Sequence, residues 1–374
     1  MKCLNPNRTR GIKTVLFFCL PGIGDCLLTT PAMGALKTAL PEVRISALTM
    51  FGGARTLLEH NPDVDEVLHF DFMNESKLKA WRFVMGLRRR RFDATILGYP
   101  ANRLEYNAIA WLVGSPVRAG HRYNHLDRRC GNWLNNVSVR EDDAATNVEE
   151  NLRLVEAVTG VPSNDTRVEL RLAPEHEAFA EAWLKREGLD GRRLVGFHAG
   201  GSVDKNHVNK RWPPESFVAL GKALVAEAGA TIVLLGGPKE AELKERVVSG
   251  IGTGAVLAQT GNIMETAALV ARCRHFVSND SALMHVAGAL GVPTSGIFGP
   301  TSAEWVRVPH APRTEVRLGL PCQPCFYYSP RHLSCKQGDF RCLRDLKAEQ
   351  VLPSVLKSLE ETGTMTHKER TANG

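Results

Sequence analysis

Residues 276–293 read FVSNDSALMHVAGALGVP, and the rest of the chain is organised around this stretch. Its apolar start predicts a short buried strand, and the polar residues 278–281 predict a turn. A helix should open at Ser281 and end before Gly291 and Pro293. This arrangement aims backbone N–H groups and the positive end of the helix dipole at one point. The stretch therefore predicts an anion site, most often a phosphate site.

The length and composition set the class of protein. The chain has 374 residues, of which 43% are hydrophobic and 23% charged, as in an ordinary globular protein. This length predicts two domains. The longest apolar run near the N-terminus, residues 15–20, is too short for a membrane span or a secretory signal. We therefore expect a cytoplasmic protein.

Apolar runs and helical patterns alternate twice along the chain, which predicts two Rossmann-like domains with parallel sheets facing a central cleft. Strands are expected at 13–20, 44–49, 66–70 and 93–98, and again at 193–198, 230–235, 255–258, 274–278 and 293–298. A turn is expected at 21–25, followed by a helix through Leu40, and loops are expected between 98 and 143. The expected divisions are a flexible N-terminus at 1–12, domains at 13–173 and 174–345, a Cys-rich loop at 320–344, a C-terminal helix at 346–362 and a disordered tail at 363–374.

The basic residues are unevenly placed. The chain has a formal net charge of +7, yet residues 77–140 alone hold thirteen Lys or Arg against the acids Asp93, Glu105 and Asp127. This excess predicts an anionic partner, such as an acidic membrane surface, a phosphorylated glycan or nucleic acid.

The first expected strand is followed by Gly22-Ile23-Gly24-Asp25, where a dinucleotide-binding fold would carry Gly-x-Gly-x-x-Gly. Leu27 stands at the third glycine position and Asp25 would repel a pyrophosphate, which opposes an NAD-dependent oxidoreductase. Asp25 is either a base that faces the binding site or the N-cap of a helix, a position that Asp favours.

The first strand of the second half is followed by HAGGS at 198–202 and KRWPP at 210–214. Gly200, Gly201 and Ser202 would let the backbone approach a phosphate, and Lys210 with Arg211 would neutralise its charge. The alternative is a solvated Lys-Arg pair before a helix that starts with proline.

Three further residues are donor-site candidates. Glu240 follows the next expected strand and can accept hydrogen bonds from ribose hydroxyls, or it can be an ordinary first-turn acid of a helix. Ser281 and the backbone after it could hold a diphosphate. His285, one turn into the helix, could face the ligand or simply pack in the interior.

Four of the nine cysteines are clustered, namely Cys322, Cys325, Cys335 and Cys342. A Cys-x2-Cys pair followed by two more thiols is compatible with a structural zinc site in a reducing compartment. Disulfides and a metal-free thiol-rich loop are the alternatives.

The segment 76–91 combines the apolar residues Leu78, Trp81, Val84 and Met85 with arginines at 88–91. Such a segment can lie on an anionic membrane. We favour a core-packed helix with a solvated basic end, whose arginines add to the attraction for an anionic partner.

Taken together, these motifs resemble glycosyltransferase family 9, the ADP-heptose:lipopolysaccharide heptosyltransferase family. The resemblance extends in the expected order over residues 13–360. It rests on Gly22-Ile-Gly24-Asp25 with Thr29-Thr30-Pro31-Ala32, on Lys210-Arg211-Trp212-Pro213, and on residues 278–287 with Phe298-Gly299-Pro300-Thr301.

The resemblance implies the GT-B fold, a donor bound by the C-terminal domain, and an inverting transfer that requires no metal or other cofactor. It implies that Asp25 is the catalytic base and that Lys210 faces the donor diphosphate. It implies that Glu240 binds the ribose of the donor, or that Glu242 does so if the alignment shifts. The remaining expected contacts are Asp280, Ser281, Ala282 and His285 for the donor, and Gly24, Thr29, His121 and Arg122 for the acceptor.

The expected reaction is transfer of a heptose from an ADP-heptose-like donor to a lipopolysaccharide core or a related cell-surface glycan. An anionic lipid-linked acceptor would explain the basic region at 77–140, and would bring the enzyme to the inner face of the cytoplasmic membrane. No nucleic acid partner is expected. The family usually has glycine where this chain has Ala282, and the added methyl group should narrow the approach of phosphate. A non-catalytic nucleotide-sugar or glycan-binding protein of the same fold is therefore the alternative.

Overall fold

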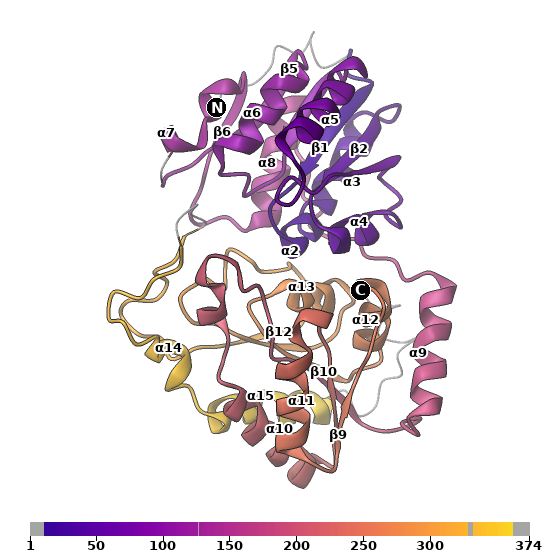
Figure 1. The fold of residues 1–374 in the computed structure, drawn as a ribbon, viewed down its shortest axis with the longest axis vertical. Helices are drawn as coiled ribbons and strands as arrows, with labels where there is room; N and C mark the ends of the chain where they lie inside the picture. Colours follow the sequence, from indigo (N-terminus) through magenta and orange to yellow (C-terminus); the bar gives the residue numbers. More distant parts are fainter. Residues whose placement is uncertain (1–10, 126, 328–331, 362–374) are drawn as a thin grey trace. The chain divides into compact units, whose positions relative to one another are not determined.

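The computed structural model describes residues 11–125, 127–327 and 332–361. The chain forms two compact units (Figure 1). Unit 1 holds the described residues up to Leu170 together with Glu304–Pro309, and unit 2 holds Arg171–Ala303, His310–Tyr327 and the described residues from 332 onward. The tail predicted at 363–374, and the flexible N-terminus predicted at 1–12 except for its last two residues, lie outside the described residues.

Unit 1 is built on a six-stranded sheet in the order β3-β2-β1-β4-β5-β6, in which all neighbouring strands are parallel. Its strands are β1 Thr14–Cys19, β2 Arg44–Thr49, β3 Glu66–His69, β4 Ala94–Leu97, β5 Val117–Arg122 and β6 Val137–Arg140. Its helices are α2 Ile23–Leu27, α3 Thr30–Ala39, α4 Gly52–Leu58, α5 Lys77–Arg89, α6 Leu104–Val113, α7 Asp127–Cys130, η1 Asn132–Leu134 and α8 Asn147–Thr159.

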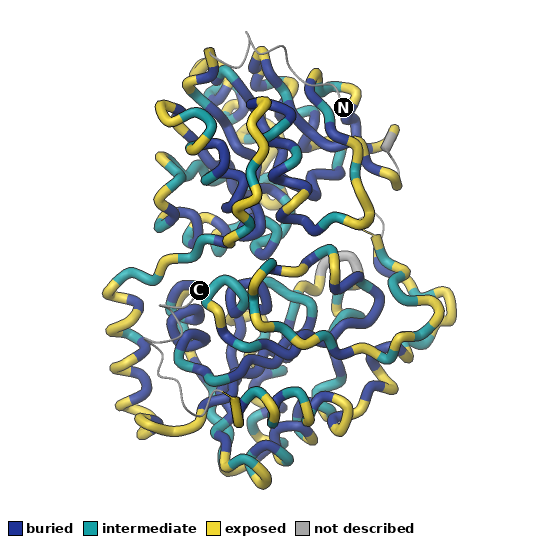
Figure 2. Tube along the Cα trace, turned by 180° about the vertical axis from the view of Figure 1, so that it is seen from behind, coloured by how far each residue is buried: buried dark blue, intermediate teal, exposed yellow. Residues whose placement is uncertain are grey.

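Helices cover unit 1's sheet, which explains why its central strands are apolar on both sides. α3 packs against α8, and α5 packs against α6. Leu16 and Phe18 of β1 join Val84 and Leu87 of α5 and Tyr106 of α6 in one buried cluster. Figure 2 shows that buried residues fill the interior of each unit and that exposed residues follow its outer turns.

Unit 2 repeats the same plan. Its sheet has the order β12-β11-β10-β7-β8-β9, again with all neighbouring strands parallel. Its strands are β7 Leu194–His198, β8 Thr231–Leu234, β9 Ala255–Leu257, β10 His275–Asn279, β11 Thr294–Ile297 and β12 Arg313–Val316. Its helices are α9 Pro174–Arg186, η2 Asp204–Lys210, α10 Pro214–Ala228, η3 Pro238–Glu240, α11 Ala241–Ile251, α12 Ile263–Ala271, α13 Ala282–Ala289, α14 Arg341–Arg344 and α15 Ala348–Glu361.

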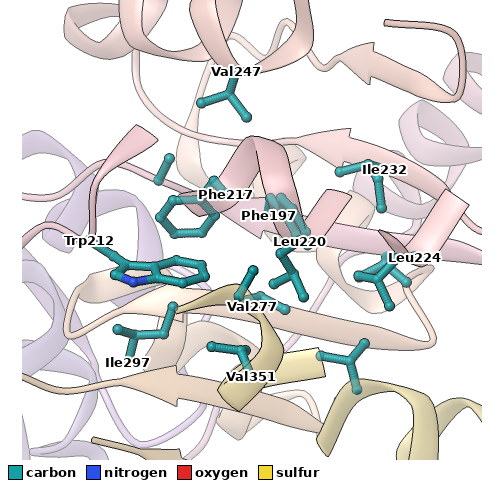
Figure 3. Close-up of a cluster of buried hydrophobic side chains, with 14 of the residues drawn as sticks. Phe197, Trp212, Phe217, Leu220, Leu224, Ile232, Val247, Val277, Ile297 and Val351 are labelled. Carbon is teal, nitrogen blue, oxygen red and sulfur yellow. The ribbon is translucent and has the colours of Figure 1, made fainter. Parts of the chain in front are cut away.

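A buried aromatic group anchors the core of unit 2 (Figure 3). The ring of Phe217 lies 5.0 Å from Trp212 and 5.6 Å from Phe197, measured between centroids, in both cases edge to face. The Trp212 indole donates to the Leu346 carbonyl at 2.9 Å. Because Trp212 directly follows Lys210 and Arg211, this packing fixes the end of the loop that carries those two cations.

Three predictions about secondary structure are wrong, each for a physical reason. The turn expected at 21–25 already contains the start of α2, and the helix expected after it through Leu40 is interrupted before α3. The interruption arises because Pro31 cannot donate an N–H to the Leu27 carbonyl, which the Thr30 hydroxyl satisfies instead at 2.9 Å. The segment 98–143, expected to be loops, contains α6, β5 and β6. The strand β12 was not anticipated. β5, β6 and β12 all carry charged residues, which hides the apolar signature of a strand.

Among the helices that the structure describes, none has both the length and the apolar character needed to cross a lipid bilayer.

Candidate functional site

The sheet of each unit reverses its strand order at one point, between β1 and β4 in unit 1 and between β7 and β10 in unit 2. Loops at the carboxyl ends of strands that flank such a reversal diverge and leave room for a ligand. The predicted donor residues Gly200, Gly201 and Ser281 follow β7 and β10 directly. Asp25 follows β1.

His198, the last residue of β7, joins two predicted donor contacts. Its Nδ1 lies 2.8 Å from the Ser281 hydroxyl and its Nε2 lies 3.2 Å from the Glu240 carboxylate. Nε2–H can donate to the ionised Glu240 carboxylate, while Nδ1 shares a hydrogen bond with the Ser281 hydroxyl. One buried ring thus holds the residue at the start of α13 and the acid that follows β8 in a common network.

Glu240 is held by the loop backbone as well. Its carboxylate accepts from the N–H of Gly201 at 2.7 Å and of Gly237 at 2.8 Å. Burial on its own would raise the Glu240 pKa, but His198 and the two N–H groups outweigh it and bring the pKa to about 2. A Cβ at Gly200 would collide with this carboxylate, so the glycine is needed for the close approach of Glu240.

Lys210 and Asp280 form a second centre. Lys210 Nζ lies 2.5 Å from Asp280 Oδ2, and the Thr301 hydroxyl donates to the same oxygen at 2.8 Å. Burial tends to raise the Asp280 pKa, but Lys210 and Thr301 favour the carboxylate and the pKa lies below its ordinary value. The Lys210 ammonium group therefore lies beside the loop that precedes α13, and the Asp280 carboxylate neutralises its charge.

His285 is buried in α13, with 5% of its surface exposed. Burial lowers its pKa to about 4 in spite of the nearby Asp280, so the ring is neutral at pH 7. Ala282, at the first turn of the same helix, is half-buried, and Ser202 is exposed.

The loops after β7 and β10 are tied together by Asn279. Its side-chain amide donates to the carbonyls of Ala199 at 2.8 Å and Gly200 at 3.0 Å, and its oxygen accepts from the Trp212 N–H at 2.9 Å. The Arg211 guanidinium donates to the Gly201 carbonyl. These bonds hold the backbone of the site independently of any ligand.

In unit 1, the Asp25 side chain closes the turn after β1. Its carboxylate accepts from the Gly22 N–H at 2.9 Å, which is the half of a helix capping box that the third helical residue supplies. Gly22 itself is the N-cap of α2, and Asp25 is the third residue of that short helix. Asp25 remains partly exposed, and its negative charge raises the pKa of buried Tyr106, which burial chiefly brings to about 12.

The four predicted acceptor contacts are placed differently from one another. Gly24 is buried, and the buried Thr29 hydroxyl donates to the Cys26 carbonyl at 2.6 Å. His121 is buried with its Nε2 3.2 Å from the Glu150 carboxylate, while Arg122 is exposed. Of these side chains, Arg122 is the one that solvent reaches.

The four clustered cysteines differ in exposure. Cys322 and Cys325 are exposed, Cys335 is intermediate and Cys342 is buried. Burial, and then the other three thiols, raise the Cys342 pKa to about 11, so the thiols influence one another. In the described part of the chain, however, no group of three or more His, Cys, Asp or Glu residues is assembled as a metal site.

Sequence reasoning missed three residues that build the donor-side network. These are His198, Asn279 as a clamp between loops, and Lys244, whose buried Nζ donates to the Gly236 carbonyl at 2.9 Å. His198 and Asn279 each end a strand beside the reversal point, which is a usable signal. Lys244 lies within α11 and gives no such signal.

Comparison with known proteins agrees with this architecture. Residues 80–334 match the model of glycosyltransferase family 9 (heptosyltransferase). The chain is 26% identical over 359 residues to lipopolysaccharide heptosyltransferase 2 of Salmonella typhimurium, covering 91% of this chain and 97% of that protein.

Two solved structures share the fold. The ADP-heptose lps heptosyltransferase II of Escherichia coli matches with a TM-score of 0.72 at 21% identity, covering 94% of this chain and 100% of that one. A family 9 glycosyl transferase of Veillonella parvula matches with a TM-score of 0.74 at 21% identity, covering 93% and 98%. The GT-B expectation is thereby confirmed, and the chain belongs to glycosyltransferase family 9, so that it is a glycosyltransferase.

Proposed function

We propose that the protein transfers a heptose from an ADP-heptose-type donor to a lipopolysaccharide core or a related cell-surface glycan, with inversion at the anomeric carbon. The observation that carries this proposal is that the loops after β7, β8 and β10 of unit 2 hold two polar centres, His198 with Ser281 and Glu240, and Lys210 with Asp280. The Salmonella relative is named a lipopolysaccharide heptosyltransferase and the Escherichia coli structure an ADP-heptose lps heptosyltransferase, which supports the choice of donor and acceptor.

Unit 2 supplies the groups for a nucleoside diphosphate. The opening N–H groups of α13 and the Ser281 hydroxyl are suited to phosphate oxygens. Lys210 is the nearby cation. Glu240, ionised with a pKa of about 2, is available to accept from ribose hydroxyls.

The proposed reaction is a single displacement. An acceptor hydroxyl attacks the anomeric carbon while Asp25 takes its proton. The bond between that carbon and the diphosphate oxygen breaks, and the diphosphate leaves with the electron pair. Lys210, Ser281 and the dipole of α13 stabilise the negative charge that grows on it. These groups and Asp25 carry out the reaction without a metal ion.

The acceptor side rests on the basic segment of unit 1. Thirteen Lys or Arg between residues 77 and 140 suit an anionic glycan, and Arg122 is the exposed member among the predicted acceptor contacts. The buried residues Gly24, Thr29 and His121 would then form the floor of the acceptor site. A lipid-linked acceptor would bring a cytoplasmic enzyme into peripheral contact with the inner face of the membrane.

A structural zinc ion held by Cys322, Cys325, Cys335 and Cys342 is a separate proposal. The mutual effect of the thiols on their pKa values supports it, whereas their arrangement is not that of a ready ligand set. The Cys325 N–H donates to the Pro300 carbonyl at 2.9 Å, next to Thr301. Such an ion would therefore brace the loop behind Asp280.

Metal analysis of the purified protein tests the zinc proposal. It predicts one zinc per chain that is lost in a Cys322→Ser/Cys325→Ser variant and retained in a Cys130→Ser variant. Less than about half an equivalent of zinc after purification without chelators would refute it, since four-thiolate zinc sites bind tightly.

The decisive experiment for the reaction uses Asp25. Purified protein, ADP-heptose and a lipopolysaccharide-core acceptor are incubated, and the product is detected by mass spectrometry. Asp25→Asn should lower kcat about a thousandfold while ADP binding is unchanged.

Glu149→Gln is the matched control, because Glu149 makes the same capping-box contact with the Thr146 N–H in α8, at 2.7 Å. Equal activity of the two variants would mean that Asp25 only caps its helix and is not the catalytic base. Absence of transfer by the wild-type protein with ADP bound would favour the non-catalytic alternative.

A further inference from the structure

Three tryptophans of unit 1 lie on its surface. Trp81 of α5 and Trp111 of α6 each have 52% of their surface exposed, and Trp133 of η1 has 73%. α5 packs against α6 (Figure 1). α6 in turn packs against η1, so the three tryptophans belong to adjoining elements. Leu78 of α5 and Leu104 of α6 are further exposed apolar residues of the same two helices. We call these five residues the tryptophan face.

Helix α5 shows that the exposure is patterned. Val84 and Leu87 are buried and join the core of unit 1. Leu78, Trp81, Arg82 and Arg89 lie three, four and seven residues apart, which places them on one side of the helix, and all are exposed. The helix is therefore core-packed on one side, as predicted. The other side carries an apolar and basic stripe, and the sequence pattern alone did not show which apolar residues of the helix would be exposed.

The stripe has a strong positive charge. Residues 77–91 contain seven Lys or Arg and no acid. Two of the seven are already paired, Lys79 with Glu75 and Arg90 with Glu66. Among the described residues, Lys77, Arg82 and Arg89 form no such ion pair. Arg128 and Arg129 of α7 add two exposed cations next to η1. These charges are available to an external anion.

The other unit does not expose its tryptophans in this way. Trp183 and Trp212 of unit 2 have 1% and 0% of their surface exposed. Leaving large aromatic rings in water forgoes much burial free energy, so a group of them on adjoining elements marks an interaction surface. Tryptophan together with Lys and Arg is the combination found where proteins meet the interface of a bilayer.

We propose that the tryptophan face docks on the surface of a lipid bilayer that carries acidic headgroups. The indole rings enter the interface, and the cations of α5 and α7 pair with lipid phosphates. This inference deepens the proposed function, since a lipid-linked acceptor is what would bring the enzyme to a membrane. A second copy of the chain is a poorer occupant, because its own basic stripe would be repelled.

Vesicle sedimentation tests the docking without donor or acceptor. The probes are phosphatidylcholine vesicles, alone or with about one-third phosphatidylglycerol, and the wild-type protein should bind the acidic vesicles alone and release with salt. Trp81→Ser/Trp111→Ser, and separately Arg82→Glu/Arg89→Glu, should each lower the partition coefficient at least about tenfold.

The matched control is Lys185→Glu/Lys222→Glu, an equal charge change on exposed residues of α9 and α10 in unit 2. It should bind as the wild type does. All variants should keep the wild-type melting temperature, because the replaced side chains are exposed. Equal binding by the stripe variants and this control would overturn the proposal.

Two further readouts separate the docking from the reaction and from self-association. With a delipidated, water-soluble acceptor, Trp81→Ser/Trp111→Ser, which keeps all the cations of the basic segment, should turn over as the wild type does, so loss of the reaction itself is detected independently of vesicle binding. A wild-type dimer in sedimentation equilibrium that becomes a monomer in Trp81→Ser/Trp111→Ser, with vesicle binding unchanged, would assign the face to a second copy and refute the membrane.

Discussion

The two units share one strand order, and the loops at their equivalent strand ends carry different chemistry. After β1 of unit 1, the turn presents the partly exposed carboxylate of Asp25, which caps its own helix. After β7 and β10 of unit 2, the loops present Lys210, His198 and Ser281 around two paired acids. The comparison teaches that strand order selects where a ligand can bind, whereas a few loop side chains decide whether a base or an anion site stands there.

Of the changes that test this difference between the units, removal of the cation of unit 2 should have the largest effect on activity. Lys210→Met combined with Asp280→Asn should lower kcat/KM for the donor by about 10²- to 10³-fold and weaken ADP binding in calorimetry. The double variant avoids leaving a buried, unpaired Asp280 carboxylate. Lys222→Met, an exposed lysine of α10, serves as control. Unchanged ADP affinity in the double variant would show that Lys210 of unit 2 does not bind the diphosphate.

A pH effect on unit 2 should come next. Burial lowers the pKa of His275 to about 3 and of His285 to about 4. The unfolded chain binds protons near the ordinary value of 6.5, so stability is complete above that pH and falls as the pH drops from 6.5 towards 4. Each histidine should cost about 2 kcal/mol between pH 7 and pH 5.

Hydrogen exchange read by mass spectrometry can locate this loss. Peptides from β10 and α13 should lose protection at pH 5, and a His285→Asn variant should lose less than the wild type does. Protection of β10 and α13 that is the same at both pH values, once intrinsic exchange rates are corrected, would contradict the assignment of neutral buried rings.

A smaller effect should follow from loosening the link between Glu240 and Ser281. His198→Asn removes a ring that contacts both residues, and ADP affinity should fall about tenfold. His275→Asn is a matched change on neighbouring β10, where the ring instead contacts Ser295 at 2.9 Å. Equal loss of ADP affinity in both variants would mean that general destabilisation, and not positioning, is responsible.

The smallest effect concerns the methyl group at the start of α13. Ala282→Gly should raise ADP affinity about threefold, because a glycine lets phosphate approach the helix backbone more closely. Ala289→Gly, at the other end of the same helix, gives the control. Weaker ADP binding in Ala282→Gly than in this control would show that the methyl group packs usefully against the donor.

Much of the fold was predictable from the chain, because apolar runs such as those of β1, β4 and β10 are buried on both sides and stand out from the helices between them. β5, β6 and β12 were not, since polar residues in the outer strands of a sheet look like loop residues. Glu240 and Ser281 could be proposed as site residues because each lies shortly after a strand, and Lys210 because it stands in the loop that follows β7.

What the sequence could not give is the pairing between distant loops. His198 and Ser281 are 83 residues apart. No local sequence pattern indicates that the His198 ring contacts both Ser281 and Glu240. The inward turn of the Thr29 hydroxyl onto the Cys26 carbonyl is likewise a result of packing. Local patterns locate strand ends, but three-dimensional packing decides which of them meet.

The contact between Lys210 and Asp280 has a consequence for turnover. In the donor-free protein the lysine already holds an internal carboxylate, so arrival of the diphosphate is an exchange of one anion for another. The same carboxylate can reclaim the lysine after transfer and help to displace ADP. Under the proposed reaction, Asp280→Asn should therefore bind ADP more tightly and release it more slowly, which makes product departure the slow step of the cycle.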